Sequence, residues 1–484
     1  MKEKKDIFEL KHLRECLGNG GKIILSYINY TIGAYLRRNV FFPFYWRYIK
    51  RSNVLECYQE LKNHQWNTLE ENTKIQQKKM YKLIEYACKN IPYYIKITRE
   101  HNLRFSEDTI FEDIKKFPIL TKEIIRNNFD ELYKFRDNTY YRNTTSGSTG
   151  EPAIFYQDKY CLEWQIATKI LFDEWAGRKI GDPIVKLWGS IEDILKGSQG
   201  IKGYLKQQLY GVTTLNSYMM TEGNLYDYVK RINKIKPHLI LAYSNSIDEL
   251  CRFIQEQDLS IYSPQAIMTS AGVLFPEFRK RIEEVFHAPV FDCYGSRETG
   301  DIACNCKKSY QLHLIPSIHY LEIVSDSGKE LNKEESGEII ITLLTNYTMP
   351  LIRYKIEDRG ILSETECSCG RGFPFLKKVE GRIRSIFRNK QGDIIDGGFF
   401  IELFYFRDYV KQLQVIQKAY DVIIINLVLR DNHRIKEAKK DFIEINKKIK
   451  LAMGYETEIK YNIVDEIKPS PSGKHMYTFS QIEY

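Results

Sequence analysis

Apolar residues recur at helical or strand spacing along most of the chain, which predicts a series of short regular elements. From Leu55 to about Tyr140 the pattern is helical, and Met80, Leu83, Ile84 and Ala87 form one apolar helix face. The segment NIPYY ends that helix, because proline cannot continue a helix and restrains the residue before it.

After residue 150, helical stretches such as Leu162 to Ala176 alternate with short apolar runs bounded by turn residues. The runs are PIVKLWG, PHLILAYS, QAIMTSAG and APVFDCYG. This alternation predicts an α/β domain in which loops at the sheet ends can hold a ligand. Residues 320–344 instead predict a hairpin with its turn at Ser325 to Glu330 and a second strand from Glu338.

The last hundred residues predict a smaller α+β unit. QLQVIQKAYDVIIINLVL gives two strands, TEIKYNIVDEI gives a third, and a helix stripe lies between them. We therefore expect a mostly helical part at 1–140, an α/β core at 141–381 and a small domain at 382–484. The residues of the helix stripe are Ile435, Ala438, Phe442, Ile445 and Ile449.

The chain has 484 residues, 72 basic and 63 acidic, and the charges of both signs are spread along it. A net charge of +9 in this form suits small anions such as nucleotides, and we expect no nucleic-acid partner. Ten cysteines without a recognisable signal segment indicate a reducing, cytoplasmic location without disulfides. No apolar run approaches the roughly 20 residues that a membrane-spanning helix needs. The oligomeric state cannot be read from the sequence.

Residues 27–51, YINYTIGAYLRRNVFFPFYWRYIKR, combine aromatic and basic side chains. Such a segment can lie on the anionic inner face of a membrane. We favour packing against the body of the chain, because aromatic rings fill cores more often than they touch lipid.

Five further stretches offer chemistry, and each has an ordinary alternative. The loop TTSGSTGEP at 144–152 suits either a turn or a cradle for a polyanion. Glu298 follows an apolar strand and could hold a metal ion, or be a solvated loop residue; Asp358 could accept from a diol or cap a turn. Arg382 and Lys474 suit anion contacts, although surface positions are the common explanation for both.

Taken in order, TTSGSTGEP, YGSRETG, RYKIEDRG, EGRIRS and PSGKHMY resemble the core motifs of the adenylate-forming ligases, which include acyl-CoA synthetases. Within them the chain is similar to the phenylacetate-CoA ligase branch and its CapK-like proteins of capsular polysaccharide synthesis. YACKNIPYY, FEDIKKFPILTKEIIRNN and CSCGRGFP resemble segments of that branch. The resemblance runs from about Leu55 to the C-terminus.

The resemblance implies activation of a carboxylic acid with ATP and Mg²⁺, release of pyrophosphate, and transfer of the acyl group to an acceptor such as coenzyme A. It implies that Glu298 binds Mg²⁺, that Asp358 accepts from the ribose hydroxyls, and that Arg382 reaches the ribose or phosphate. Lys474, on a mobile C-terminal lid, would stabilise the adenylation transition state. The other residues implied to contact ATP are Thr145, Ser146, Gly147, Ser148, Thr149 and Gly150 at the phosphates, and Ser270, Ala271, Gly272, Tyr294, Gly295, Ser296 and Arg297 around the nucleotide.

Three positions depart from the pattern of the superfamily. Arg297 replaces the hydroxyl residue that commonly precedes the magnesium glutamate, and a guanidinium there can contact phosphate. Ser385 stands where a hinge aspartate is expected, which puts the usual rotation of the lid and transfer to coenzyme A in question. Ala153 replaces the lysine that commonly follows the phosphate loop.

Cysteine and histidine residues gather in CNCKKSYQLH and CSCG, a composition that suits a closed tetrahedral Zn²⁺ site. The C-x-C spacing alone fits unlinked buried cysteines equally well. Because relatives in the branch carry a similar set, the resemblance favours structural zinc on Cys306, His313, Cys367 and Cys369, with Cys304 left out.

These features together predict an adenylate-forming carboxylate ligase that serves surface-polysaccharide synthesis. Its acceptor is coenzyme A, or an amino or hydroxyl group of a sugar or carrier. Acyl-pocket residues are expected within 188–190, 243–245 and 270–272. The alternative from another class is a ligase-shaped nucleotide-binding scaffold without turnover, against which the joint presence of Glu298, Asp358 and Lys474 argues.

Overall fold

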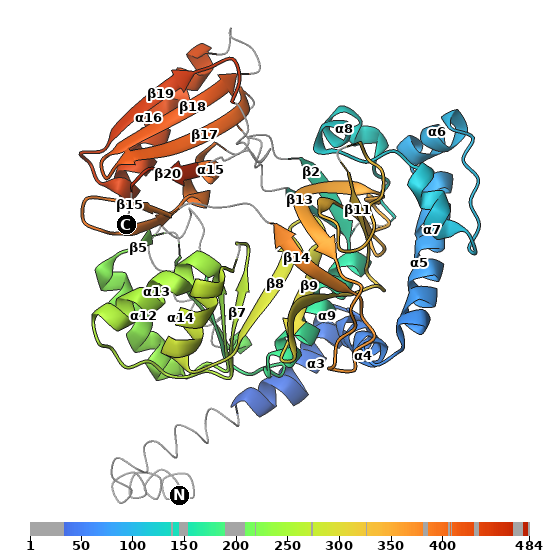
Figure 1. Cartoon of the computed structure of the whole chain (residues 1–484), viewed down its shortest axis with the longest axis horizontal. Coiled ribbons are helices and arrows are strands. Elements are labelled where there is room, and N and C mark those ends of the chain that lie inside the picture. The colour runs from blue at the N-terminus through green and yellow to red at the C-terminus, as the bar shows by residue number, and fades with distance from the viewer. Residues whose placement is uncertain are drawn as a thin grey trace, which may run out of the picture.

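The computed structural model of the chain describes residues 33–136, 139–144, 153–188, 209–217, 219–272, 274–325, 327–380, 386–404, 407, 409–429, 435–467 and 478–482. One sheet of eleven strands runs through the larger part of the molecule (Figure 1). In spatial order its strands are β11 (His319–Val324), β12 (Gly337–Leu343), β13 (Tyr354–Leu362), β14 (Phe375–Glu380), β10 (Ser309–Leu314), β9 (Gly300–Cys306), β8 (Val290–Ser296), β7 (Ala266–Ser270), β6 (Leu239–Tyr243), β3 (Ile184–Leu187) and β4 (Val212–Leu215).

The sheet changes from parallel to antiparallel at β8. Strands β4, β3, β6, β7 and β8 are parallel to one another, whereas β8 pairs antiparallel with β9 and every later pair is antiparallel. Among the parallel strands the order reverses at β3, which has β4 on one side and β6 on the other, and ligands of α/β sheets bind beyond the carboxyl ends of the strands at such a point. The predicted α/β core is confirmed, since its four apolar runs form β3, β6, β7 and β8.

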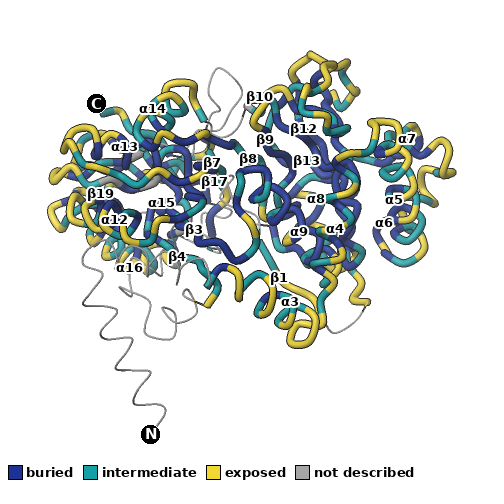
Figure 2. The backbone as a smooth tube through the Cα atoms, turned by 90° about the horizontal axis from the view of Figure 1, so that it is seen from below, coloured by how far each residue is buried: buried dark blue, intermediate teal, exposed yellow. Residues whose placement is uncertain are grey.

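Helices cover both faces of the parallel half. On one face α12 (Glu222–Ile235), α13 (Ser244–Glu256) and α14 (Pro276–Phe286) pack on alternate apolar residues of the strands. On the other face α9 (Lys159–Trp175) joins the largest apolar cluster and packs with α4 (Val54–His64), while α5 (Leu69–Asn90) joins the same cluster beside β11 of the antiparallel half (Figure 1). Figure 2 shows the resulting pattern, with buried strands inside and exposed edges on the outer helices.

The N-terminal helices follow the predicted apolar pattern. Helix α5 begins with a capping box at Thr68 and buries the predicted face of Met80, Leu83, Ile84 and Ala87. It ends at Asn90, and proline then occupies the first turn of α6 (Pro92–Glu100), where its missing N–H is not needed. The short elements that follow are α7 (Ile110–Asp113), η3 (Ile114–Lys116), α8 (Lys122–Asn127) and η4 (Phe129–Glu131).

A separate hairpin flanks the predicted phosphate loop. Strand β1 (Tyr140–Thr144) pairs antiparallel with β2 (Ile154–Asp158), and Thr144 faces Ile154 across the pair. Residues 145–152 between them lie outside the described residues. The end of β2 is fixed by Asp158, whose side chain accepts from the backbone N–H groups of Cys161 at 2.8 Å and Tyr347 at 2.9 Å.

The smaller C-terminal unit lies beside α12–α14 (Figure 1). Its sheet has the order β19 (Glu458–Ile463), β18 (Val422–Leu429), β17 (Val410–Ala419), β20 (Thr478–Ser480). Helix α16 (Ile435–Met453) buries Ala438, Ile445 and Ile449 against this sheet, which confirms the predicted stripe.

A small sheet and an ion pair connect the C-terminal residues to the larger part. Its order is β15 (Ile386–Arg388), β16 (Ile394–Asp396), β5 (Met219–Met220), and α15 (Gly398–Leu403) follows it. Arg388 Nη2 also lies 2.8 Å from Glu249 Oε2. The predicted hinge at residues 381–385 lies outside the described residues, so the domain limits stay a prediction.

The first described residues form a continuous helical rod of η1 (Arg37–Phe41), α3 (Phe42–Phe44) and η2 (Tyr45–Ile49). Within the described part of the chain, no helix is both long and apolar enough to cross a bilayer.

The buried ion pair of Arg353 and Glu322 holds the N-terminal helices to the sheet. Arg353 Nη2 lies 3.0 Å from Glu322 Oε1, and its Nη1 donates to the carbonyl oxygens of Lys115 and Phe117. Arg353→Met should lower the free energy of unfolding by about 3–5 kcal/mol, because Glu322 would remain buried and unpaired. Urea unfolding followed by tryptophan fluorescence measures this change.

Adding Glu322→Gln to Arg353→Met should restore part of the loss. Lys377→Met is the control, since its ion pair with Glu334 is exposed and should be worth less than about 1 kcal/mol. Equal losses for Arg353→Met and Lys377→Met would contradict this account.

Candidate functional site

The turn between β8 and β9 places the residues of YGSRETG. A Cβ at Gly295 would come within 2.6 Å of the Gly300 carbonyl oxygen, and Gly300 itself has φ +75°. Both positions therefore require glycine. Ser296 Oγ accepts from the Thr299 N–H at 3.2 Å, which closes the turn around Glu298.

Glu298 is buried, with 6% of its surface exposed, and the Tyr354 hydroxyl donates to its Oε1 at 3.1 Å. Among the described residues, no hydrogen bond or ion pair reaches its second carboxylate oxygen. A hard oxygen ligand in this position fits Mg²⁺. The side-chain amide of Gln157, on β2, donates to the backbone carbonyl of Glu298 at 3.1 Å and ties the turn to the phosphate-loop hairpin.

His319 supports the same turn from β11. Its Nε2 lies 2.9 Å from the Thr299 carbonyl oxygen, to which a neutral imidazole donates. Burial lowers the pKa of His319 to about 4, so the ring is neutral near pH 7. The histidine therefore positions the turn without adding charge.

Asp358 lies on β13 beside the same turn. The Tyr294 hydroxyl donates to its Oδ2 at 3.0 Å. In the pairing of β12 with β13, Glu338 faces Arg359 and Ile340 faces Lys355. One residue of β12 therefore lies opposite three residues of β13, so β13 bulges at Asp358.

The neighbouring residue Glu357 holds this bulge in place. Glu357 adopts a left-handed φ of +68°, which costs a non-glycine residue about 1 kcal/mol or more. Its Oε2 lies 2.6 Å from the Nζ of buried Lys122, at the start of α8. The ion pair thus offsets the strain of the bulge.

The meeting of β8 with β13 spans three intervening strands. At about 4.8 Å per strand the two would be roughly 19 Å apart in a flat sheet. The bonds Tyr294–Asp358 and Tyr354–Glu298 therefore require the antiparallel half to curl back over the end of β8.

The TSAG segment continues the site at the end of β7. Ser270 ends the strand, Ala271 has φ +59°, and the Gly272 carbonyl accepts from Ser244 Oγ at 3.3 Å. The expected pocket residues Trp188 and Tyr243 stack with ring centroids 4.1 Å apart and pack on the apolar cluster of the C-terminal unit.

The structure thus brings Tyr294, Glu298 and Asp358 together, with Arg297 exposed on the turn. Ala153, in the position of the missing lysine, is buried at the start of β2. Other predicted residues lie outside the described part, namely Thr145, Ser146, Gly147, Ser148, Thr149, Gly150, Arg382, Ser385 and Lys474. Sequence reasoning missed the supporting residues Gln157, His319 and Tyr354; only Tyr354 lies inside a recognised motif.

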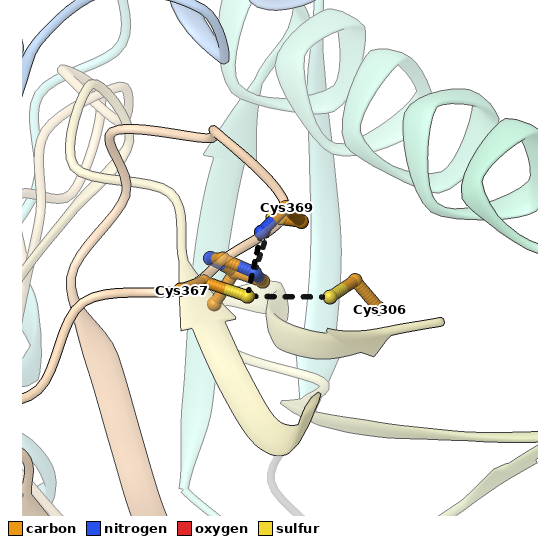
Figure 3. A group of neighbouring side chains, drawn as sticks. Cys306, Cys367 and Cys369 are labelled. Carbon is orange, nitrogen blue, oxygen red and sulfur yellow. Dashed lines mark hydrogen bonds between the residues drawn. The ribbon is translucent and has the colours of Figure 1, made fainter. Parts of the chain in front are cut away.

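A second group joins Cys306, His313, Cys367 and Cys369, whose ligand atoms all lie within 4.8 Å of one another. Cys306 Sγ is 3.6 Å from Cys367 Sγ, and Cys369 Sγ is 3.4 Å from His313 Nε2. In Figure 3 the sulfur atoms of Cys306, at the end of β9, and Cys367, in the loop between β13 and β14, face each other, and the backbone N–H of Cys369 points at Cys367. Cys304 is outside this group and faces Cys293 at 2.7 Å.

The shape of the loop is set by its glycines and by Arg371. Gly370 has φ +82°, and a Cβ at Gly372 would meet the Asn67 carbonyl oxygen at 2.0 Å. The Arg371 guanidinium lies 5.1 Å from the Trp66 ring and 4.4 Å from the Trp175 ring. The loop is thereby fixed to the junction of α4 and α5.

Three thiolates and one imidazole form a donor set that fits Zn²⁺. Burial lowers the pKa of His313 to about 4, which leaves the neutral ring that a metal binds. Burial raises the pKa of Cys367 to about 12, so metal binding would release its proton. For Cys369 burial acts in the same direction, but hydrogen bonds from Arg371 outweigh it and lower the pKa.

Known proteins resemble the chain in sequence and in fold. A family model described as the CapK C-terminal domain matches residues 387–481. Protein CapK of Staphylococcus aureus is 26% identical over 90% of this chain and 95% of its own length. Phenylacetate-coenzyme A ligase of Thermus thermophilus is 24% identical over 64% of this chain and 69% of its own.

Among solved structures, 2-hydroxyisobutyryl-CoA ligase in a postadenylation state, with an acyl-AMP bound, has a TM-score of 0.55. The two chains are 17% identical, and the match covers 87% of this chain and 92% of the ligase, so it supports the fold. The chain is thus similar to CapK and to phenylacetate-coenzyme A ligases in sequence, and it shares the fold of an adenylate-forming ligase. The predicted fold class, with a large α/β part and a smaller C-terminal domain, is confirmed.

Protein purified without added metal should contain close to one zinc per chain by elemental analysis. Cys369→Ser should abolish most of this content, because a closed structural site needs all four ligands. Cys88→Ser, which changes a cysteine outside the group, is the control and should keep its zinc. Clearly substoichiometric zinc in the unmodified chain would end the zinc proposal.

Acidification should destabilise the chain through His319. Its folded pKa of about 4 lies below the unfolded value of roughly 6.5, so the unfolded state binds more protons between these values. Above pH 6.5 the neutral His319 contributes fully to the free energy of unfolding. Between pH 7 and pH 5 protonation of the unfolded state lowers that free energy by about 2 kcal/mol. His319→Gln keeps a donor for Thr299 and should show a smaller fall in melting temperature over this range.

The exposed histidine variant His101→Gln serves as the control and should fall with pH as the unmodified chain does. If His319→Gln and His101→Gln respond to pH alike, the assigned role of His319 is wrong.

Proposed function

We propose that the chain uses ATP and Mg²⁺ to convert a carboxylic acid to an acyl-adenylate and then passes the acyl group to an acceptor. Sequence similarity to phenylacetate-coenzyme A ligases supports the first step. We assign the acceptor as coenzyme A, or an amino or hydroxyl group of a sugar or carrier. The likeness to Protein CapK supports a role in surface-polysaccharide synthesis.

One observation carries this proposal, namely the contact of two distant motifs at the end of the parallel strands. YGSRETG and RYKIEDRG meet through two hydrogen bonds, Tyr294 to Asp358 and Tyr354 to Glu298. The first pair offers an aromatic face beside a carboxylate that can accept from a diol. The second holds a carboxylate in place while its other oxygen is left for a cation.

Adenylation brings a carboxylate against the α-phosphate of ATP, so the chain must orient two anions and neutralise the charge that develops. In the proposal Glu298 holds Mg²⁺, and the backbone N–H groups and hydroxyls of residues 145–150 hold the β- and γ-phosphates. Exposed Arg297 adds a guanidinium next to Glu298. Arg382 and Lys474 complete the charge set, and Lys474 bridges the reacting carboxylate and the ribose.

The acceptor and the acid are the open parts of the chemistry. Ser385 replaces the expected hinge aspartate, so the second step need not follow the coenzyme A route. Trp188 and Tyr243 stand between the parallel strands and the C-terminal unit, where a change in the position of that unit would alter their surroundings. We therefore assign these two rings to the acyl pocket.

The purified chain should exchange labelled pyrophosphate into ATP when the correct carboxylic acid is present. Lys474→Ala should reduce this exchange at least about 100-fold, because a preorganised charge at the transition state is lost. Glu298→Gln should do the same by weakening the Mg²⁺ site. Lys460→Ala, which removes an exposed lysine of β19 paired with Glu458, is the control and should exchange normally.

A panel of acids should include hydroxy acids, amino acids, aryl acids and sugar acids. Nucleotide binding without exchange for any of them would favour the scaffold and refute the ligase. Once an acid is found, thioester formation with coenzyme A or amide formation with an amino sugar identifies the acceptor.

A further inference from the structure

Residues 33–51, a helical rod up to Ile49 with the two residues that follow it, are here called the N-terminal rod and have two different faces. Its inner face is fixed to the body of the molecule. Arg37 Nε donates to the Gly181 carbonyl oxygen at 2.7 Å, and Arg38 forms an ion pair with Asp182. The buried ring of Phe42 packs with Tyr210 at 5.8 Å between centroids. The favoured interpretation of this segment, packing on the body of the chain, therefore holds for one face.

The outer face of the rod is apolar and exposed. Leu36, Val40, Phe44 and Tyr48 follow one another at intervals of four residues and form a stripe along one side. Each is more than half exposed, and the rod around α3 lies at the edge of the molecule in Figure 2. The full set of exposed large apolar residues on the rod is Tyr35, Leu36, Val40, Phe44, Tyr48 and Ile49.

The charge around this stripe has one sign. From Cys16 to Leu55 the sequence contains no Asp or Glu and six basic residues. Two of these, Arg37 and Arg38, are used on the inner face, whereas Arg47, Lys50 and Arg51 are exposed. The next acid along the chain, Glu56, lies 3.8 Å from Arg47, and both side chains are largely exposed, so this pair adds little.

We propose that the outer face of the N-terminal rod lies on an anionic lipid surface. Phe44, Tyr48 and Leu36 would enter the boundary between headgroups and acyl chains, while Arg47 and Lys50 contact lipid phosphates. An exposed apolar stripe flanked by basic side chains, without acids along the segment, is the pattern of an interfacial helix on an anionic bilayer. The rod is far too short and too basic to cross the bilayer, so it lies in the interface plane.

A bilayer also suits the shape of the feature. The stripe runs along a rod at the edge of the molecule in Figure 2, and a cavity of about 630 Å³ beside α14 has no residue of the rod in its lining. A fluid surface can follow such a strip without a complementary groove. This inference does not depend on the proposed ligase activity, because none of its residues belongs to the nucleotide site.

Vesicle flotation of the full chain tests the proposal. Phosphatidylcholine vesicles with about one third phosphatidylglycerol should bind the chain at least about tenfold more strongly than pure phosphatidylcholine vesicles. Raising the salt concentration from 50 to 500 mM should reduce this binding, because charge attraction is screened. The double variant Phe44→Ser/Tyr48→Ser should lower binding about tenfold while its melting temperature stays unchanged.

A matched control changes exposed apolar residues outside the rod. Ile443→Ser/Tyr455→Ser removes side chains that are 77% and 74% exposed and should bind vesicles normally. Absence of binding to both vesicle types, or equal binding by the two double variants, would overturn the proposal. It would also be overturned if Phe44→Ser/Tyr48→Ser instead dissociated an oligomer in lipid-free buffer, since the stripe would then be a contact between copies.

Discussion

The candidate site depends on how closely β8 and β9 approach at their turn. Gly295 pairs with Asp301, a Cβ on it would meet the Gly300 carbonyl oxygen at 2.6 Å, and Gly300 has φ +75°, so the turn stays narrow. Glu298 on this turn reaches Tyr354 of β13. A wider turn would move Tyr294 and Glu298 away from their partners on β13, Asp358 and Tyr354. Asp358 and Tyr354 reach β8 only because the antiparallel strands curl. A small shift of either strand would therefore break the hydrogen bonds that hold the site together.

Local pattern predicted the elements well, because helix and strand periodicity are encoded within a few turns of chain. The apolar face of α5, the four parallel strands and the stripe of α16 all follow from spacing alone. The contacts that define the site could not be read this way. Gln157 and His319 meet the β8–β9 turn from far along the sequence, and β5 pairs with β16 across more than 170 residues. The family resemblance predicted that Glu298 and Asp358 lie in one site. It did not predict the residues that support this site, namely Gln157, His319 and Tyr354.

The Cys/His group has a structural reason to accompany this site. Cys306 and His313 come from β9 and β10, whereas Cys367 and Cys369 come from the loop that joins β13 to β14. A metal ion bound by all four would therefore join both sides of the curled sheet. Asp358 lies on β13 before that loop, so closing the loop would restrict the strand that carries it. The C-x-C spacing alone did not decide between a zinc site and unlinked buried cysteines. The two pairs of cysteines come together with His313 only in the folded chain, where β10 pairs with β14.

The position of the N-terminal rod relates the proposed lipid surface to the site. Arg37 and Arg38 join the rod to Gly181 and Asp182 in the turn just before β3, at the amino end of the parallel strands. Trp188 follows the carboxyl end of β3. This strand has four residues, so its two ends are about 13 Å apart. The residues proposed to bind the nucleotide on β7, β8 and the β8–β9 turn also lie at carboxyl ends, so a molecule resting on its rod would turn this edge away from the lipid. Water-borne ATP would then reach the site freely, and only an acceptor presented well above the headgroups could meet the activated acyl group.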